Sequence, residues 1–376
     1  MRIGIMCYPT FGGSGVVATE LGKALAEKGH SVHFITYSQP VRLEHFQENV
    51  FYHEVTVADY PLFEFAPYES ALTSKLVDVA VFEQLDLVHV HYAVPHASVA
   101  YMAKQILAEK GISLPFITTL HGTDITLVGK NESYSPVVTF GINHSDAVTS
   151  VSASLRNDTY VNFRISKEIE VIPNFIDLSR FSRLKKEHFR RAIAPNNEKI
   201  IIHASNFRPV KRVNDVIAVF NRIRERIPAK LLMIGDGPER GRVEKEAREC
   251  PMSDSIRFIG KLEAMEEVLS VGDLFILPSE SESFGLAALE AMACQVPVIS
   301  SNTGGIPELN IHGVTGFMSE VGDVDDMAAN ALSILSDEAT LQEFKKNALA
   351  QAKRFDIREI LPLYENLYQR VVSRQN

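Results

Sequence analysis

Short apolar segments of strand length alternate with helix-like segments along the chain, and this alternation limits the fold more than any other feature. The first such segments are residues 2–8, 31–37, 85–91, 114–120, 145–151 and 169–175, the last of which contains, near its end, a proline and an asparagine that break the strand. Between the first two, apolar residues recur at helical spacing up to a glycine at position 29. Apolar strands that alternate with helices predict a parallel sheet covered by helices on both faces.

The pattern restarts in the second half of the chain, at residues 199–205, 229–235, 255–260, 272–278 and 296–300. A length of 376 residues suits two domains at about 150 residues each. We therefore predict two doubly wound, Rossmann-like α/β domains, residues 1–170 and 171–356, which face each other across a cleft with a hinge near 172–176. The helix-like tail, residues 357–376, is a candidate to pack back on the first domain.

Composition excludes several functional classes. The chain has 38 basic and 47 acidic side chains and a formal net charge of −9, which disfavours general nucleic-acid binding because phosphate contacts need clustered cations. Apolar runs fall short of the roughly 18 residues of a membrane span, and the start lacks the features of a signal peptide. The three cysteines have no CxxC partner, so we expect buried structural thiols. These features predict a cytoplasmic protein, with a homo-oligomer left open.

Ligands of open α/β sheets bind beyond the carboxyl ends of the strands, so the residues after each strand are the site candidates. Residues 10–15 after the first strand are rich in glycine and precede a helix, an arrangement that suits an anion. Residues 13–18 also fit the dinucleotide fingerprint, but no acid follows the second strand before Glu44, which disfavours NAD. A tight turn without a ligand is the alternative.

Histidines gather at two neighbouring strand ends. His121 opens the segment HGTD directly after a strand, where it is either a site residue or a capped loop histidine. His89, His91 and His96 could suggest zinc, but they lack a fourth ligand with recognisable spacing, so core or cleft-edge positions are favoured.

The second half contains a cationic loop and a pair of glutamates. Arg208, Lys211 and Arg212 follow a strand closely, which suggests a bound diphosphate, with solvated surface charge as the alternative. Glu282 precedes an expected helix start at positions 284–285, and Glu290 lies eight residues later, about two turns along that helix. Two carboxylates on either side of a helix start can hold two sugar rings that flank a diphosphate, although a capped amphipathic helix explains the pattern too.

Two further motifs are better explained by structure. The turn GDGPE at residues 235–239 has glycines for unusual backbone angles and a proline near a helix start. Residues 323–325 match D-x-D, but an acidic helix start explains them better than a metal-bound diphosphate.

Together these motifs resemble the family 4 retaining glycosyltransferases of the GT-B fold, over nearly the whole chain. Four segments, residues 7–30, 91–97, 118–126 and 205–213, most resemble a branch of this family that moves N-acetylglucosamine from UDP-N-acetylglucosamine to L-malate, the first step of bacillithiol biosynthesis. It implies that Gly13 approaches the donor phosphate, that His121 contacts the donor sugar, that Glu282 binds sugar hydroxyls and that Glu290 holds the ribose. It also places three backbone amides near the sugar and phosphate, those of Phe284, Gly285 and Leu286.

The family pattern assigns the leaving diphosphate to Lys211 and a nearby arginine. That arginine usually stands five residues before the lysine, where this chain has Asn206, so Asn206 becomes a donor-site candidate and Arg208 the replacement cation. Gly260 and Leu262 would line the uracil pocket. Since the glutamates are assigned to binding, the resemblance implies front-face displacement with retention and no metal requirement for catalysis.

A dicarboxylate acceptor needs hydrogen-bond donors in the first domain. Ser14, Tyr92 and Thr119 follow strand ends, and the Gly15 amide adds positive potential at a helix start. We predict that these four residues hold malate. The alternatives are a different acceptor, a UDP-sugar epimerase of the same fold, an NAD-dependent oxidoreductase and a non-catalytic sugar-binding module.

Overall fold

The computed structural model describes residues 1–376 except positions 11, 44–45, 58–63, 130, 185 and 375–376. The chain divides into two compact units, unit 1 with Met1–Asn174 and Ile357–Asn376, and unit 2 with Phe175–Asp356. The chain therefore crosses between the units twice. Each unit has its own parallel sheet and its own apolar core.

In the described part of unit 1, seven parallel strands form a sheet in the order β3-β2-β1-β4-β5-β6-β7. The strands are β1 (Arg2–Met6), β2 (Ser31–Thr36), β3 (Val50–Glu54), β4 (Leu87–His91), β5 (Phe116–Leu120), β6 (Ala147–Ser150) and β7 (Ile169–Val171). The helices are α1 (Gly13–Glu27), α2 (Tyr68–Phe82), α3 (Ser98–Glu109), α4 (Ser135–His144), α5 (Ala153–Asn162) and α14 (Ile357–Ser373).

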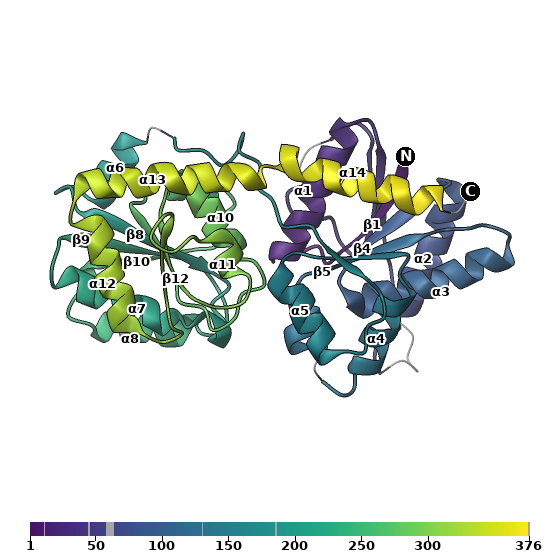
Figure 1. The fold of residues 1–376 in the computed structure, drawn as a ribbon, viewed down its shortest axis with the longest axis horizontal. Helices are drawn as coiled ribbons and strands as arrows, with labels where there is room; N and C mark the ends of the chain where they lie inside the picture. Colours follow the sequence, from purple (N-terminus) through teal and green to yellow (C-terminus); the bar gives the residue numbers. More distant parts are fainter. Residues whose placement is uncertain (11, 44–45, 58–63, 130, 185, 375–376) are drawn as a thin grey trace. The chain divides into compact units, whose positions relative to one another are not determined.

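Helix α14 comes from the end of the chain and belongs to unit 1, where it lies against α1 (Figure 1). Its apolar face buries Tyr364 and Tyr368 completely. The Tyr368 hydroxyl lies 2.7 Å from Nδ1 of His89 on β4, and Glu365 lies 3.1 Å from Nε2 of His30. These contacts hold the tail helix on unit 1.

The described part of unit 2 repeats the topology with six parallel strands in the order β10-β9-β8-β11-β12-β13. The strands are β8 (Lys199–Ser205), β9 (Ala229–Gly235), β10 (Ile256–Gly260), β11 (Leu274–Leu277), β12 (Val298–Ser301) and β13 (Gly316–Ser319). The helices are α6 (Glu187–Ile193), α7 (Val213–Arg224), α8 (Arg240–Glu249), α9 (Met265–Leu269), α10 (Leu286–Ala293), α11 (Ile306–Leu309), α12 (Val324–Leu335) and α13 (Glu338–Ala352).

The predicted doubly wound α/β fold is confirmed for both units, and each strand expected from the sequence is present. The alternation pattern missed β3 and β13, which lie at sheet edges. Edge strands are less buried, and β3 has no fully buried residue, so its sequence lacks the continuous apolar run of a central strand. Among the described residues, no helix is both long and apolar enough to cross a membrane.

Candidate active site

Most of the predicted site residues follow the strands that meet at the point where strand order reverses. In unit 1 this point lies between β1 and β4, and in unit 2 it lies between β8 and β11. Open α/β sheets bind ligands beyond the carboxyl ends of the strands at such a point. Every predicted site residue lies at the carboxyl end of β1, β4 or β5 in unit 1 or of β8, β10 or β11 in unit 2, or in the loop or helix that follows that strand.

The loop after β1 brings the start of α1 close to its own backbone. A Cβ on Gly15 would lie 2.5 Å from the carbonyl oxygens of both Tyr8 and Thr10, so only glycine fits there. The Gly15 amide donates to the Gly12 carbonyl at 3.1 Å, and Gly13 is the exposed first residue of the helix. The chain thus presents an accessible helix start, whose dipole favours an anion.

Two predicted acceptor residues meet beside this helix start. Ser14 Oγ lies 3.1 Å from the Tyr92 hydroxyl, although 78 residues separate them in sequence. The Tyr92 ring also packs against Tyr8, with centroids 5.5 Å apart, and against His121 at 5.4 Å. The structure therefore brings together predicted residues from the ends of β1, β4 and β5.

Thr119 is placed differently from these neighbours. It is fully buried, and its Oγ1 lies 2.6 Å from His89 Nε2 and 2.6 Å from Thr149 Oγ1. The hydroxyl is thus engaged between strands and offers no exposed surface to a ligand. The acceptor role of Thr119 remains a prediction, and its contacts fit a support beneath the site.

His121 is a partly exposed ring held by a second histidine. Its Nε2 lies 2.8 Å from Nδ1 of His91, and the two rings stack with centroids 5.0 Å apart. Desolvation by the surrounding protein lowers the pKa of His121 to about 3, and burial lowers the pKa of His91 well below its usual value. Both rings are therefore neutral near pH 7, and His121 can offer a hydrogen bond without a charge.

The zinc alternative for His89, His91 and His96 is not supported by their contacts. His89 bonds Tyr368 and Thr119 through its two nitrogens, and His96 donates from Nδ1 to the His91 carbonyl at 2.6 Å. The rings hold the ends of β4 and β5 together instead of converging on one point.

Asp124 is a site-building residue to which the sequence reasoning gave no role. Its carboxylate accepts the Ala93 amide at 3.0 Å and the Gly122 amide at 2.9 Å, which ties the loop after β5 to the loop after β4. Burial raises the pKa of Asp124 to about 6, and the backbone N–H donors oppose that rise. Its signal was the acid at the end of HGTD, which is typical of a side chain that caps its own loop.

In unit 2 the predicted leaving-group cation meets the predicted sugar carboxylate. Lys211 Nζ lies 2.5 Å from Glu282 Oε1, across 71 residues of sequence, and Ser279 Oγ donates to the same oxygen at 2.9 Å. Arg208 and Asn206, from the same loop as Lys211, are exposed. A ligand with phosphate and hydroxyl groups can therefore bind Lys211 and Glu282 in place of the contact that these two side chains make with each other.

Glycines hold the Glu282 loop from behind, and the sequence reasoning missed them. The Gly305 amide donates to the Glu282 carbonyl at 2.8 Å, and a Cβ on Gly304 would lie 2.0 Å from that carbonyl oxygen. The Glu280 amide donates to the Val210 carbonyl at 2.8 Å and so joins the loops after β11 and β8. The sequence signal was the pair of glycines after β12.

The GDGPE turn has the structural role expected of it. Gly235 has a φ of +125°, and a Cβ there would lie 1.8 Å from the Ser205 carbonyl oxygen. The Glu239 amide donates to the Phe207 carbonyl at 3.0 Å. The turn therefore supports the backbone of the cationic loop from the side.

Helix α10 begins later than predicted. Gly285 has a φ of +95° and only caps the helix, which starts at Leu286, while Phe284 is buried against Phe355 with ring centroids 5.5 Å apart. Glu290 is thus the fifth helical residue, little more than one turn from the start instead of two. Phe284 and Gly285, where the helix was expected to start, instead form a turn before it, with Gly285 in the left-handed region.

The remaining predicted donor residues follow β10. Gly260 ends this strand with a φ of +84°, and Leu262 is half-buried two residues later. Arg212, which the sequence grouped with the cationic loop, is paired with Asp215 at 2.7 Å. Asp323 accepts the Asp326 amide at 3.0 Å, so the D-x-D segment is the acidic helix start that was predicted.

Comparison with known families divides the chain as its two sheets do. Residues 11–180 match the family described as Glycosyltransferase Family 4. Residues 185–351 match the family described as Glycosyl transferases group 1. The first match covers β2 to β7 of the first sheet, and the second covers all six strands of the second sheet, β8 to β13.

Individual proteins resemble the chain over its full length. N-acetyl-alpha-D-glucosaminyl L-malate synthase of Bacillus anthracis is 46% identical over 99% of this chain and 97% of its own. Sucrose-phosphate synthase of Thermosynechococcus elongatus superposes with a TM-score of 0.82 at 21% identity, covering 99% of both chains. HepE of Anabaena, solved with UDP and glucose, gives 0.82 at 20% identity over 98% of this chain and 99% of its own.

Proposed function

Because this chain belongs to the family 4 glycosyltransferases of the GT-B fold, we propose that it transfers N-acetylglucosamine from UDP-N-acetylglucosamine to the hydroxyl of L-malate. The observation that carries this choice of substrates is the 46% identity, over nearly the full length of both chains, to the B. anthracis malate synthase. The site chemistry supports the proposal independently, as follows.

Unit 2 supplies the groups that a nucleotide sugar requires. Lys211 and the exposed Arg208 offer two cations to the diphosphate, and the start of α10 adds backbone N–H groups. Glu282 binds sugar hydroxyls, and Glu290, 8% exposed, holds the ribose. Gly260 and Leu262 line the uracil pocket, as the family pattern implies.

The protein contributes charge stabilisation and position more than covalent chemistry. The bond between the anomeric carbon and the phosphate oxygen breaks while the bond to the malate oxygen forms on the same face. The malate hydroxyl proton passes to the departing phosphate oxygen, and UDP leaves with its charge balanced by Lys211. Glu282 is already held by Lys211 and Ser279, which suits a binding carboxylate better than a nucleophile. The reaction needs no metal ion in this scheme.

Unit 1 supplies the acceptor contacts. Ser14 Oγ donates to the Tyr92 hydroxyl beside the start of α1. A carboxylate near the helix dipole can accept a hydrogen bond from Tyr92, and one from Ser14 when it replaces the present Ser14–Tyr92 bond. His121 is neutral and donates or accepts a hydrogen bond at the donor sugar without placing a positive charge beside the sugar, where positive charge develops in the transition state.

The test is UDP release from UDP-N-acetylglucosamine across a panel of matched acceptors. We expect turnover with L-malate, none with succinate, which lacks the hydroxyl, and weak turnover with L-lactate, which lacks one carboxylate. Proton NMR of the product should show the α-anomer. Equal turnover with and without L-malate would contradict the proposed acceptor, and a new sugar nucleotide formed without acceptor would indicate an epimerase.

A further inference from the structure

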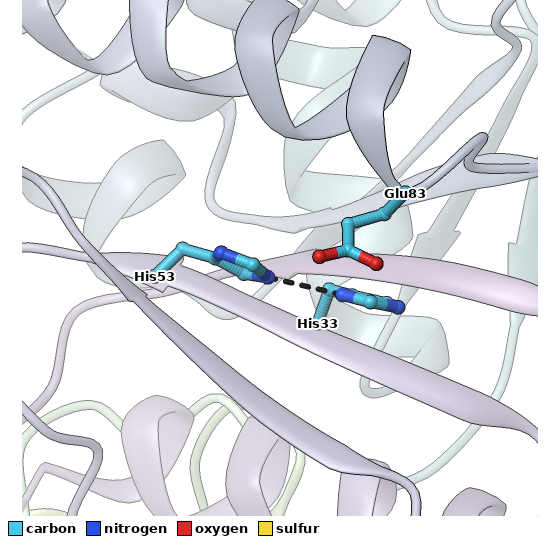
Figure 2. A group of neighbouring side chains, drawn as sticks. All are labelled: His33, His53 and Glu83. Atoms are coloured by element: carbon cyan, nitrogen blue, oxygen red, sulfur yellow. Dashed lines mark hydrogen bonds between the residues drawn. The ribbon is translucent and has the colours of Figure 1, made fainter.

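Three potential metal ligands converge on the outer strands of unit 1. They are His33 on β2, His53 on the neighbouring edge strand β3, and Glu83, which directly follows α2 (Figure 2). No residue assigned to substrates comes from these elements. We propose that His33, His53 and Glu83 form a binding site for a divalent transition-metal ion, with zinc as the best fit.

The two imidazoles already have the spacing of metal ligands. His33 Nδ1 and His53 Nε2 are 3.0 Å apart, and the ligand atoms of all three residues lie within 4.8 Å of one another. Two nitrogens bound to one zinc ion at about 2.0–2.1 Å, with angles of 90–110°, stand about 2.9–3.4 Å apart. The Glu83 carboxylate is directed toward both rings (Figure 2), so small side-chain rotations complete a three-ligand set.

The contact between the two rings also indicates where the ion would bind, at His33 Nδ1 and His53 Nε2. Two neutral imidazoles at this distance share one proton. When a metal ion accepts a lone pair from each of these two nitrogens, that proton moves to the second nitrogen of its own ring, and both imidazoles stay neutral. The other nitrogen of His33 lies 3.0 Å from Ser31 Oγ, and Phe51 stacks on the ring with centroids 4.8 Å apart. A hydrogen bond on the second nitrogen and a packed ring face are what orient a ligating histidine.

Charge and burial favour binding as well. Burial lowers the pKa of His33 to about 4 and also lowers the pKa of His53, so both rings keep the neutral form that metals require. Glu83 supplies a negative charge, whereas the nearby Arg2 donates to Gln84 at 2.8 Å. Two imidazoles with one carboxylate suit zinc and disfavour calcium and magnesium, which prefer oxygen ligands.

The location assigns this ion a structural role. The ion would tie β2 and the edge strand β3 to the end of α2. Gln84, next to Glu83, contacts the beginning of β1, whereas the substrate residues follow the ends of strands. Zinc binding should therefore stabilise unit 1 without taking part in transfer.

The test is titration of the full-length, metal-free protein with Zn²⁺ alone, followed by calorimetry and by thermal unfolding. We expect one equivalent to bind and to raise the unfolding temperature. His53→Ala should abolish this shift, and the isosteric Glu83→Gln should weaken binding about tenfold or more. Co²⁺ absorption provides a second readout, since its band intensity reports four-coordination, here by the three side chains and one water molecule.

Two other histidines provide the controls. His144→Ala removes an exposed ring elsewhere in unit 1, and His121→Asn disrupts the separate histidine group near the substrate site. Both variants should keep the single zinc site, and His53→Ala should keep transferase activity, so this test is independent of the proposed reaction. The proposal is overturned if the wild type binds no stoichiometric zinc, if His53→Ala and Glu83→Gln bind like the wild type, or if His121→Asn removes the site.

Discussion

Replacing Lys211 by alanine removes the cation that the proposed mechanism uses most. Its Nζ lies 2.5 Å from Glu282, and its side chain is 19% exposed, so the charge acts in a partly desolvated environment. A preorganised charge at a leaving group contributes about 3 kcal/mol to transition-state stabilisation, which corresponds to roughly 100-fold in rate. We expect kcat of Lys211→Ala to fall by about that factor.

The matched control is Arg212→Ala, which removes a cation one position later. Arg212 pairs with Asp215 at 2.7 Å on its own helix, and a partly exposed pair of this kind contributes less than about 1 kcal/mol. UDP release at saturating donor and acceptor measures kcat for both variants, and urea unfolding verifies that both are folded. A folded Lys211→Ala enzyme with kcat within about fivefold of the wild type, equal to the control, would refute the role of Lys211.

Three further predictions address the acceptor, the helix start and the core. Ser14→Ala should raise the KM for L-malate about tenfold with little change in the KM for the donor, because a hydrogen bond to a charged group contributes about 1.5 kcal/mol. An unchanged malate KM in steady-state assays would argue against the contact between Ser14 and the acceptor. Gly285→Ala should lower the free energy of unfolding by about 1–3 kcal/mol in urea titrations, because φ is +95° and the new Cβ would lie 2.5 Å from the Ile306 side chain; wild-type stability would contradict this. Burial lowers the pKa of His89 to about 3 in the folded chain. Between that pH and about 6.5, the ordinary histidine pKa, the unfolded chain therefore binds one more proton than the folded chain. Stability should therefore fall as pH drops through this window, and His89→Asn should reduce the slope of unfolding free energy against pH; an unchanged slope would contradict the neutral buried ring.

Much of the site could be predicted because each motif directly follows a strand. In parallel sheets the carboxyl ends of all strands meet at one edge, so the HGTD segment, the loop of Lys211 and the loop of Glu282 had to lie at strand ends. Local geometry was less predictable. The cap at Gly285 shortened the distance from the helix start to Glu290, because a left-handed glycine turn does not show in apolar spacing.

Contacts between segments that are distant in sequence could not be predicted from the spacing of apolar and polar residues. The pairing of Ser14 with Tyr92 and the burial of Thr119 depend on which strands lie side by side. The zinc candidate formed by His33 and His53 has no recognisable ligand spacing, because adjacent strands bring the two rings together.

The order of apolar and polar residues alone determined two parallel α/β units and the chemical groups at their strand ends. Backbone hydrogen bonding and burial impose the spacing of apolar residues in each strand and helix locally. Only the tertiary structure decided which of these groups touch. Strand order and loop packing bring Lys211 to Glu282 and let the tail helix join unit 1, and such long-range contacts depend on the whole packed sheet instead of on any local segment.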